Sequence, residues 1–261
     1  MSDDPIVEWA RLRAPQLRTL CAESPVVIIP TASTEQHGPH LPVMTDARIG
    51  QAVAIRAARK SWDKRKALVL PVQFMGLSEH HMPYGGTLTL DHETYGAILG
   101  GLVRSVQRHG IKDVLISNSH GGNIIANQMF AEKLAMSTGM TIVAANYSRE
   151  AAAEIAALLD DQPGIQHACE AETSMMMALE PDLVDGSDLA ALNSPRKAFL
   201  SAGKGAFRWR PFTHMTASGV AGHPEKATLE KGRAIFRAAA DGIAAVITDP
   251  DSWAPPDDMR A

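Results

Sequence analysis

The sequence predicts a three-layer α/β/α protein, in which helices cover both faces of a mainly parallel central sheet. Short apolar runs rich in β-branched residues alternate with longer helical stretches, an order typical of βαβ units. These runs lack a polar residue at every second position, which is typical of strands buried on both faces of a parallel sheet. We find no internal repeat and no linker, so we expect residues 1–261 to form a single domain.

The alternation of patterns places each element. The expected strands are residues 26–30, 67–70, 114–117 and 141–145, and the expected helices are residues 46–60, 94–109, 123–138, 148–159 and 225–248. Pro224 stands in the favoured first-turn region of the last helix, and the tail from Pro250 is expected to fray. In parallel sheets, sites collect beyond the carboxyl ends of the strands, so we searched the loops that follow them.

Composition argues against several classes of partner. The net charge is −4 and no basic run occurs, so the chain lacks the positive patch that attracts nucleic acids or anionic membranes. Its two cysteines, Cys21 and Cys169, lie far apart in no CxxC pattern, which suits a reducing compartment. The sequence shows no signal-peptide pattern and no apolar run of membrane-spanning length. We expect a cytoplasmic protein that binds neither nucleic acid nor membranes.

Two ionisable residues, Glu35 and His37, follow the first expected strand directly. In an extended loop, residues i and i+2 point to the same side, so both side chains can face one point. A carboxylate oxygen together with an imidazole nitrogen suits Zn, Mn or Fe better than Mg or Ca. Asp46 opens the next helix, where it is either a helix-capping acid or a further ligand.

A histidine and two glycines, in the sequence Ser119-His120-Gly121-Gly122-Asn123, follow the third expected strand. The turn could cradle a phosphate, but it matches neither the P-loop nor the dinucleotide-binding fingerprint. His120 could also be a buried structural histidine. We favour a metal ligand, with Gly121 and Gly122 allowing the backbone to approach a substrate.

A carboxylate pair, Glu170 and Glu172, precedes the apolar stretch Met175-Met176-Met177. If a helix begins near Ala168, Glu172 lies on its second turn, and a carboxylate buried there needs a cation or a metal to stay ionised. The two carboxylates cannot both face one point on a helix. We therefore expect Glu170 to be a solvated acid.

Five segments in order resemble the signature segments of the creatininase (creatinine amidohydrolase) family. They are TEQHGPHLPVMTD, GLSEHHMPYGGTLTL, SHGGN, HACEAETS and SGVAGHPEKAT, which lie between residues 34 and 228. The resemblance implies a creatininase-like fold, a homohexamer and two divalent metal ions per chain, with Zn preferred over Mn or Fe. It also implies an enzyme, an amidohydrolase in which a metal-activated hydroxide cleaves a C–N bond.

The resemblance also implies ligands for each metal ion. Glu35 and His120 would hold one ion, His37 the other, and Asp46 would bridge the two. Creatininase itself has a glutamate ligand to the second ion at the position of Gly122. Without it, His37 and a shared Asp46 would be too few protein ligands for Zn, which takes at least three. We expect Glu172 to complete the second set.

Catalytic and substrate roles follow from the same segments. His167 is expected to protonate the leaving nitrogen, with Glu172 as a second catalytic group. Ser78, Gly121 and Gly122 are expected to contact the substrate, the glycines through backbone N–H groups. His81 could support a ligand.

We expect a small-molecule substrate, with a non-peptide bond in an amide, lactam or formamide. The loops of residues 76–86, 147–150 and 196–215 would select it, and Tyr84, Tyr147, Phe207 and Trp209 could line the pocket. The alternatives are creatinine itself, a peptide, a nucleotide-binding module, or a metal-dependent binding protein without turnover.

Overall fold

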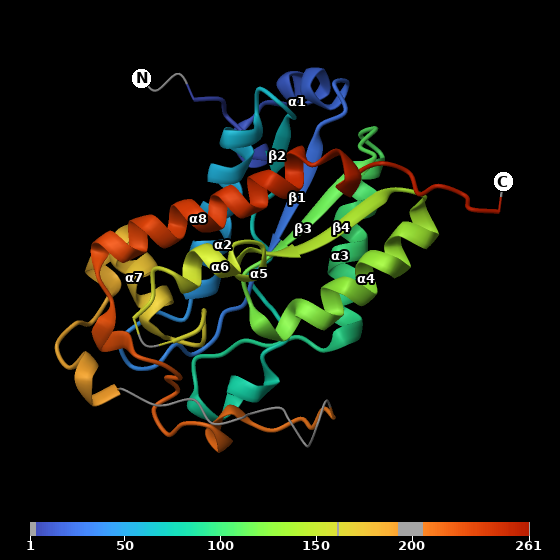
Figure 1. The fold of residues 1–261 in the computed structure, drawn as a ribbon. Coiled ribbons are helices and arrows are strands. Elements are labelled where there is room, and N and C mark those ends of the chain that lie inside the picture. The colour runs from blue at the N-terminus through green and yellow to red at the C-terminus, as the bar shows by residue number, and fades with distance from the viewer. Residues whose placement is uncertain (1–3, 161, 193–205, 261) are drawn as a thin grey trace.

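The computed structural model describes residues 4–160, 162–192 and 206–260. Within these residues, four parallel strands form one sheet in the order β2-β1-β3-β4 (Figure 1). They are β1 (Val26–Thr31), β2 (Ala67–Val69), β3 (Asp113–Asn118) and β4 (Thr141–Asn146). Helices lie on both sides of the sheet, so the predicted three-layer α/β/α fold is confirmed.

The larger helices form the two outer layers. They are α2 (Thr45–Ser61), α3 (His92–Gln107), α4 (Ile124–Thr138), α7 (Glu170–Leu179) and α8 (Leu229–Thr248). Shorter helices are α1 (Ala14–Cys21), α5 (Tyr147–Glu150) and α6 (Ala152–Ala156). No helix among the described residues combines the length and the apolar character that crossing a lipid bilayer requires.

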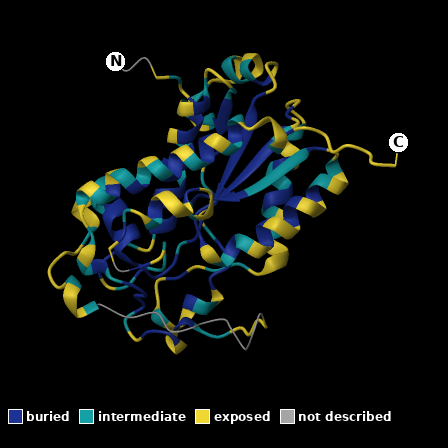
Figure 2. Cartoon of the chain, viewed as in Figure 1, coloured by how far each residue is buried: buried dark blue, intermediate teal, exposed yellow. Residues whose placement is uncertain are grey.

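Alternate side chains of β1 enter two separate cores. Val26 and Ile28 pack with residues of α2, α7 and α8, whereas Val27 and Ile29 pack with residues of α3 and α4. Figure 2 shows β1, β2 and β3 buried between helices whose outer faces are exposed, whereas most of β4 is intermediate. Burial on both faces requires apolar residues at successive positions, which explains the continuous apolar sequence of β1.

The ends of several predicted helices are wrong. The last helix begins at Leu229 rather than near residue 225, because the Thr228 side chain caps it by accepting the Lys231 N–H. Pro224 instead opens a separate 3₁₀ turn, η7 (Pro224–Lys226). The helix predicted over residues 148–159 is divided into α5 and α6. Helix α1 was not predicted.

The predicted fraying of the tail from Pro250 is wrong for its first residues. Pro250 opens a 3₁₀ turn, η8 (Pro250–Ser252), and the Trp253 ring beyond it is buried. The indole N–H of Trp253 donates to the carbonyl oxygens of Val246 and Ile247. This contact holds the segment against the end of α8.

The prediction that Glu170 is solvated is also wrong. Its side chain is fully buried, and its carboxylate accepts from Lys231 Nζ at 2.5 Å and from the Asp160 N–H at 3.2 Å. Helix α8 packs against α7 and brings the lysine to this carboxylate. The buried negative charge is thus paired.

A glycine in α8, Gly232, allows the close packing of α8 on α7. An added Cβ there would overlap the Ser174 carbonyl oxygen. We predict that Gly232→Ala lowers the free energy of unfolding by about 1–3 kcal/mol, because the helices must separate. Chemical denaturation measures this change.

The matched control for this prediction is Gly101→Ala in α3, where an added Cβ meets nothing within 4 Å. It should be neutral, or should stabilise the fold by up to about 1 kcal/mol, because alanine favours helices over glycine. Equal destabilisation by both substitutions would contradict the close contact between α7 and α8.

Candidate metal centre

The predicted ligand residues lie together at the carboxyl-terminal edge of the sheet. Glu35 and His37 follow β1, and His120 follows β3. Asp46 lies in the first turn of α2, and Glu172 lies in the first turn of α7. All five side chains are buried, with at most 4% of the residue surface exposed.

The loop between β1 and α2 folds back on itself and turns its acidic and imidazole groups inward. Gly38 has a φ of 65°, a left-handed conformation that glycine adopts without strain, and His37 then pairs with Leu41. The Glu35 N–H donates to the Val43 carbonyl oxygen at 3.0 Å. The sequence Gly38-Pro39 thus produces a turn that brings residues 35 and 37 next to α2.

The capping alternative for Asp46 does not describe its contacts. The N-cap residue of α2 is Met44, and no side chain caps this helix. The Asp46 carboxylate points to two histidines instead, with Oδ1 3.4 Å from His37 Nε2 and Oδ2 3.1 Å from His120 Nδ1. One carboxylate therefore lies between two imidazole groups.

His120 presents one nitrogen to two carboxylates. Its Nε2 lies 3.2 Å from the Leu77 carbonyl oxygen and donates to it. In the neutral ring Nδ1 is then unprotonated, and it lies 3.1 Å from Glu35 Oε2 and 3.1 Å from Asp46 Oδ2. An imidazole lone pair enclosed by carboxylate oxygens requires a proton or a metal ion between them.

His37 shows the same arrangement on the other side of Asp46. Its Nδ1 lies 3.1 Å from the Glu35 carbonyl oxygen, to which it donates. Its buried Nε2 has no hydrogen-bond partner within the described part of the chain. This atom faces Asp46 Oδ1 at 3.4 Å and Glu172 Oε2 at 3.9 Å. His37, Asp46 and Glu172 form a group whose spacing could hold one metal ion.

Protons balance the carboxylates in the metal-free chain. Burial raises the pKa of Glu172 to about 7, although the nearby His37 opposes this rise. Burial would lower the pKa of His37, but Asp46 and Glu172 raise it to about 9. Burial would lower the pKa of His120 as well, but Glu35 and Asp46 raise it well above its usual value. These nitrogen and oxygen donors fit divalent ions of the Zn or Mn type.

The two glycines after His120 differ in their surroundings. A Cβ at Gly122 would overlap the Leu77 carbonyl oxygen and His120 Nε2, so this backbone leaves no room for a side chain. A Cβ at Gly121 would meet nothing within 4 Å. Position 122 therefore cannot supply a glutamate ligand unless the His120 ring moves, whereas the Glu172 carboxylate already faces His37.

Ser78 contacts the side chain of Glu35, a predicted ligand. Its hydroxyl donates to Glu35 Oε2 at 2.6 Å and lies 2.5 Å from the Ser33 hydroxyl. The side chain is fully buried, so it holds the Glu35 carboxylate in place. Its predicted contact with substrate stays a prediction.

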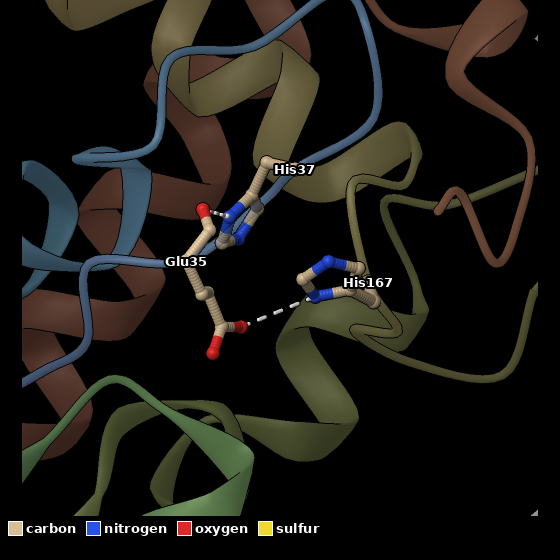
Figure 3. Close-up of side chains that lie close together, drawn as sticks. All are labelled: Glu35, His37 and His167. Atoms are coloured by element: carbon tan, nitrogen blue, oxygen red, sulfur yellow. Dashed lines mark hydrogen bonds and ion pairs between the residues drawn. The ribbon is translucent and has the colours of Figure 1, made fainter. Parts of the chain in front are cut away.

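His167 approaches the same carboxylate from the opposite side. Figure 3 shows its ring beside Glu35 and His37, with Nδ1 3.5 Å from Glu35 Oε1. The rings of His167 and His37 have centroids 4.3 Å apart. His81 joins this group, since its Nε2 lies 3.4 Å from Glu35 Oε1.

Sequence reasoning missed His80 and Phe212 in this site. His80 forms a group with Glu35 and His120 whose spacing could also hold a metal ion. Phe212 packs over the histidines, with its ring centroid 4.4 Å from that of His81 and 4.9 Å from that of His167. The GLSEHHM segment contained a signal for His80, but an isolated phenylalanine in a loop gives none.

The four aromatic residues predicted to line the pocket differ in their exposure. Tyr84 packs edge-on against Phe212 and donates to the Thr216 carbonyl oxygen. Tyr147 is buried, whereas Phe207 and Trp209 are exposed. Residues 196–205 of the predicted loop lie outside the described residues.

The fold and the buried nitrogen and oxygen donors define a class of α/β/α proteins with a candidate site for divalent metal ions. The chain belongs to the creatininase family: the family described as Creatinine amidohydrolase matches residues 10–247. The resemblance found in the sequence is thereby confirmed.

Relatives cover nearly the whole chain. A mycofactocin precursor peptide peptidase of Mycolicibacterium smegmatis is 30% identical over 229 residues, which are 87% of this chain and 86% of the relative. Creatinine amidohydrolase of Pseudomonas putida is 27% identical over 241 residues, 86% of this chain and 89% of the relative.

The fold is shared with solved creatininase structures. A crystal structure of creatinine amidohydrolase has a TM-score of 0.81 at 25% identity and covers 94% of this chain and 97% of that chain. Similar structures include a manganese form and a zinc form of creatininase. The prediction of a hydrolase of the amidohydrolase type, acting on C–N bonds, is confirmed.

We predict that metal binding releases about two to three protons per chain at pH 7. With a pKa of about 9, His37 is protonated in the metal-free chain at this pH, and the raised pKa of His120 favours its protonated form. Glu172, with a pKa of about 7, is about half protonated. A metal ion needs their lone pairs, so affinity rises as the pH rises towards 9. Calorimetric titration with Zn²⁺ in buffers of different ionisation enthalpy measures the release. A binding heat that does not depend on the buffer would contradict it.

Proposed function

We propose that this chain is a dinuclear metal-dependent amidohydrolase that cleaves a non-peptide C–N bond of a small amide, lactam or formamide. One observation carries the proposal. The two oxygens of Asp46 are divided between His37 and His120, and each histidine faces a second carboxylate. Two adjacent donor sets that share one carboxylate fit two ions side by side.

Each proposed set contains one histidine and two carboxylates. Glu35, His120 and Asp46 would hold the first ion, and His37, Asp46 and Glu172 the second. Divalent ions bound there would acidify a water and polarise the substrate carbonyl. Zn and Mn both suit these donors, and similar creatininase structures contain one or the other.

The chain's own residues would handle protons and position the substrate. His167 lies beside Glu35, with Nδ1 3.5 Å from Oε1, and there it would take a proton from the attacking water and give it to the leaving nitrogen. The backbone N–H groups of Gly121 and Gly122 would bind the carbonyl oxygen. Phe212 covers the histidines and limits water access.

A second candidate is hydrolysis of a peptide bond. It is supported by the relative named mycofactocin precursor peptide peptidase, which matches 87% of this chain. The burial of every ligand side chain favours the smaller substrate, because a peptide chain needs an open groove.

Hydrolysis assays on metal-free and metal-loaded protein test the proposal. The substrates are lactams, formamides, creatinine and short peptides, each with Zn²⁺ or Mn²⁺. We expect turnover of a non-peptide amide that a chelator abolishes and added metal restores. Turnover of peptides alone would establish the second candidate. Metal binding with no hydrolysis of any substrate would reject both.

The proposal includes a single domain, a cytoplasmic location and a homohexamer, the last carried over from the family. Exposed apolar side chains on α4 support an assembly. Ile125 is 74% and Met136 is 81% exposed, and Met129 lies between them on the same helix face. Such a patch is typical of a subunit contact.

We predict that Glu172→Gln reduces the metal content from about two ions per chain to about one, because a neutral amide is a weaker ligand than a carboxylate. Elemental analysis after dialysis measures the content. Glu170→Gln is the matched control, since it changes a buried carboxylate on the same helix that pairs with Lys231 instead. Retention of two ions by both variants would reject the role of Glu172.

We predict that His167→Ala retains both metal ions but lowers kcat by about a hundredfold, the usual contribution of a general acid–base group. The ring is absent from both proposed donor sets, so its removal leaves the carboxylates in place. Metal analysis and steady-state kinetics on the best substrate of the panel measure the two effects. Near-normal kcat would remove His167 from the mechanism.

A further inference from the structure

The Gln36 side chain lies between two ligand residues, and two backbone groups set its orientation. Its Oε1 accepts the Gly38 N–H at 2.9 Å, and its Nε2 donates to the Gly219 carbonyl oxygen at 3.2 Å. A flipped amide would place Nε2 against an N–H group and Oε1 against a carbonyl oxygen. The amide nitrogen therefore faces inward, and the side chain is only 6% exposed.

This orientation determines which nitrogen of His81 carries the proton. Gln36 Nε2 lies 2.7 Å from His81 Nδ1 and can only donate, so Nδ1 is the acceptor. The proton of the neutral ring is then on Nε2, which lies 3.4 Å from Glu35 Oε1. His81 thus directs an N–H at the Glu35 carboxylate.

The backbone of the same residue determines the tautomer of His167. The Gln36 carbonyl oxygen lies 2.8 Å from His167 Nε2 and requires a donor there. The nearby Gln36 Nε2, at 3.0 Å from this nitrogen, donates to His81 and Gly219 instead. His167 Nδ1 is therefore unprotonated in the neutral ring, and it faces Glu35 Oε1 at 3.5 Å.

We propose that Gln36 is a positioning residue that makes His81 present an N–H group, and His167 a nitrogen lone pair, to Glu35 Oε1. Its amide makes His81 a donor, and its carbonyl leaves His167 with a lone pair. Glu35 Oε2 faces His120 and Ser78, so Oε1 is the oxygen that these histidines share. The catalytic consequence rests on the proposed function: a lone pair on His167 Nδ1 can receive the proton of the attacking water.

Gly219 helps to fix the orientation of the Gln36 amide. Gly219 has a φ of 84°, and an added Cβ would overlap Gln36 Oε1. The loop can therefore bring its carbonyl oxygen to the amide only if residue 219 has no side chain. The stacked rings of His81 and His167, with centroids 4.4 Å apart, are held together by the same contacts.

The test is Gln36→Glu, which keeps the shape of the side chain but removes its only donor. A carboxylate oxygen next to His81 Nδ1 requires a proton on that nitrogen, so the hydrogen-bond pattern of His81 must change. We expect the metal content to stay unchanged and kcat to fall about tenfold or more, with KM changed by less than about threefold. Gln73→Glu is the matched control, since Gln73 is buried but lies outside the histidine group.

A spectroscopic readout separates this proposal from the proposed function. Nitrogen NMR of zinc-loaded protein labelled with ¹⁵N-histidine reports which ring nitrogens carry protons, and the His81→Asn spectrum assigns the signals. We expect a bare Nδ1 on His81 in the wild type and a protonated Nδ1 in Gln36→Glu.

A protonated His81 Nδ1 in the wild type would overturn the proposal even if the variant did not fold. A pattern unchanged by Gln36→Glu would overturn it as well. Neither result depends on substrate turnover, so the absence of hydrolysis would count against the proposed function alone.

Discussion

The burial of three carboxylates at one end of the sheet is the constraint on which the site depends. Burying an unpaired ionised carboxylate costs several kcal/mol, so each one requires a compensating positive charge. The ion pairs recorded for Glu35, Asp46 and Glu172 in the described chain are all with histidines. The position of Asp46 in the first turn of α2 adds the favourable helix dipole. Imidazole groups allow the same cluster to be neutralised by protons or by metal ions, depending on pH.

Backbone carbonyl groups decide how these histidines face the carboxylates. The carbonyl oxygens of Leu77, Glu35 and Gln36 accept from the outer nitrogens of His120, His37 and His167, respectively. Each ring then directs its lone pair at the centre, which is the orientation that a metal ligand or a proton acceptor requires. His81 differs because its outer nitrogen meets a side-chain N–H, and it therefore directs a proton at the centre. The loops that supply these groups follow β1 and β2, so the parallel sheet places them together.

Sequence patterns reveal interactions between residues that are close along the chain, but not between residues that are far apart in it. Continuous apolar runs identify strands that are buried on both faces. The candidate site residues could be found in the sequence because they directly follow these strands. Glu170 was misassigned because its partner Lys231 lies 61 residues away, and helix periodicity does not reveal which face meets α8. Gln36 gave no signal, since its importance lies in contacts with residues 81, 167 and 219.

The absence of a side chain at position 122 and the proposed ligand role of Glu172 have one geometric explanation. The backbone at Gly122 lies close to the Leu77 carbonyl oxygen and to the His120 ring, which donates to that oxygen. That close approach orients His120, but it excludes a ligand from the same turn. Helix α7 packs on α2 and brings the Glu172 carboxylate to His37 from the other side. Because the Ala168 N–H also donates to Glu172 Oε2, at 2.5 Å, the backbone just before α7 holds this carboxylate in place. In the proposed donor set, the second ion would thus be completed from a helix, and that helix packs closely on α8 where Gly232 meets Ser174.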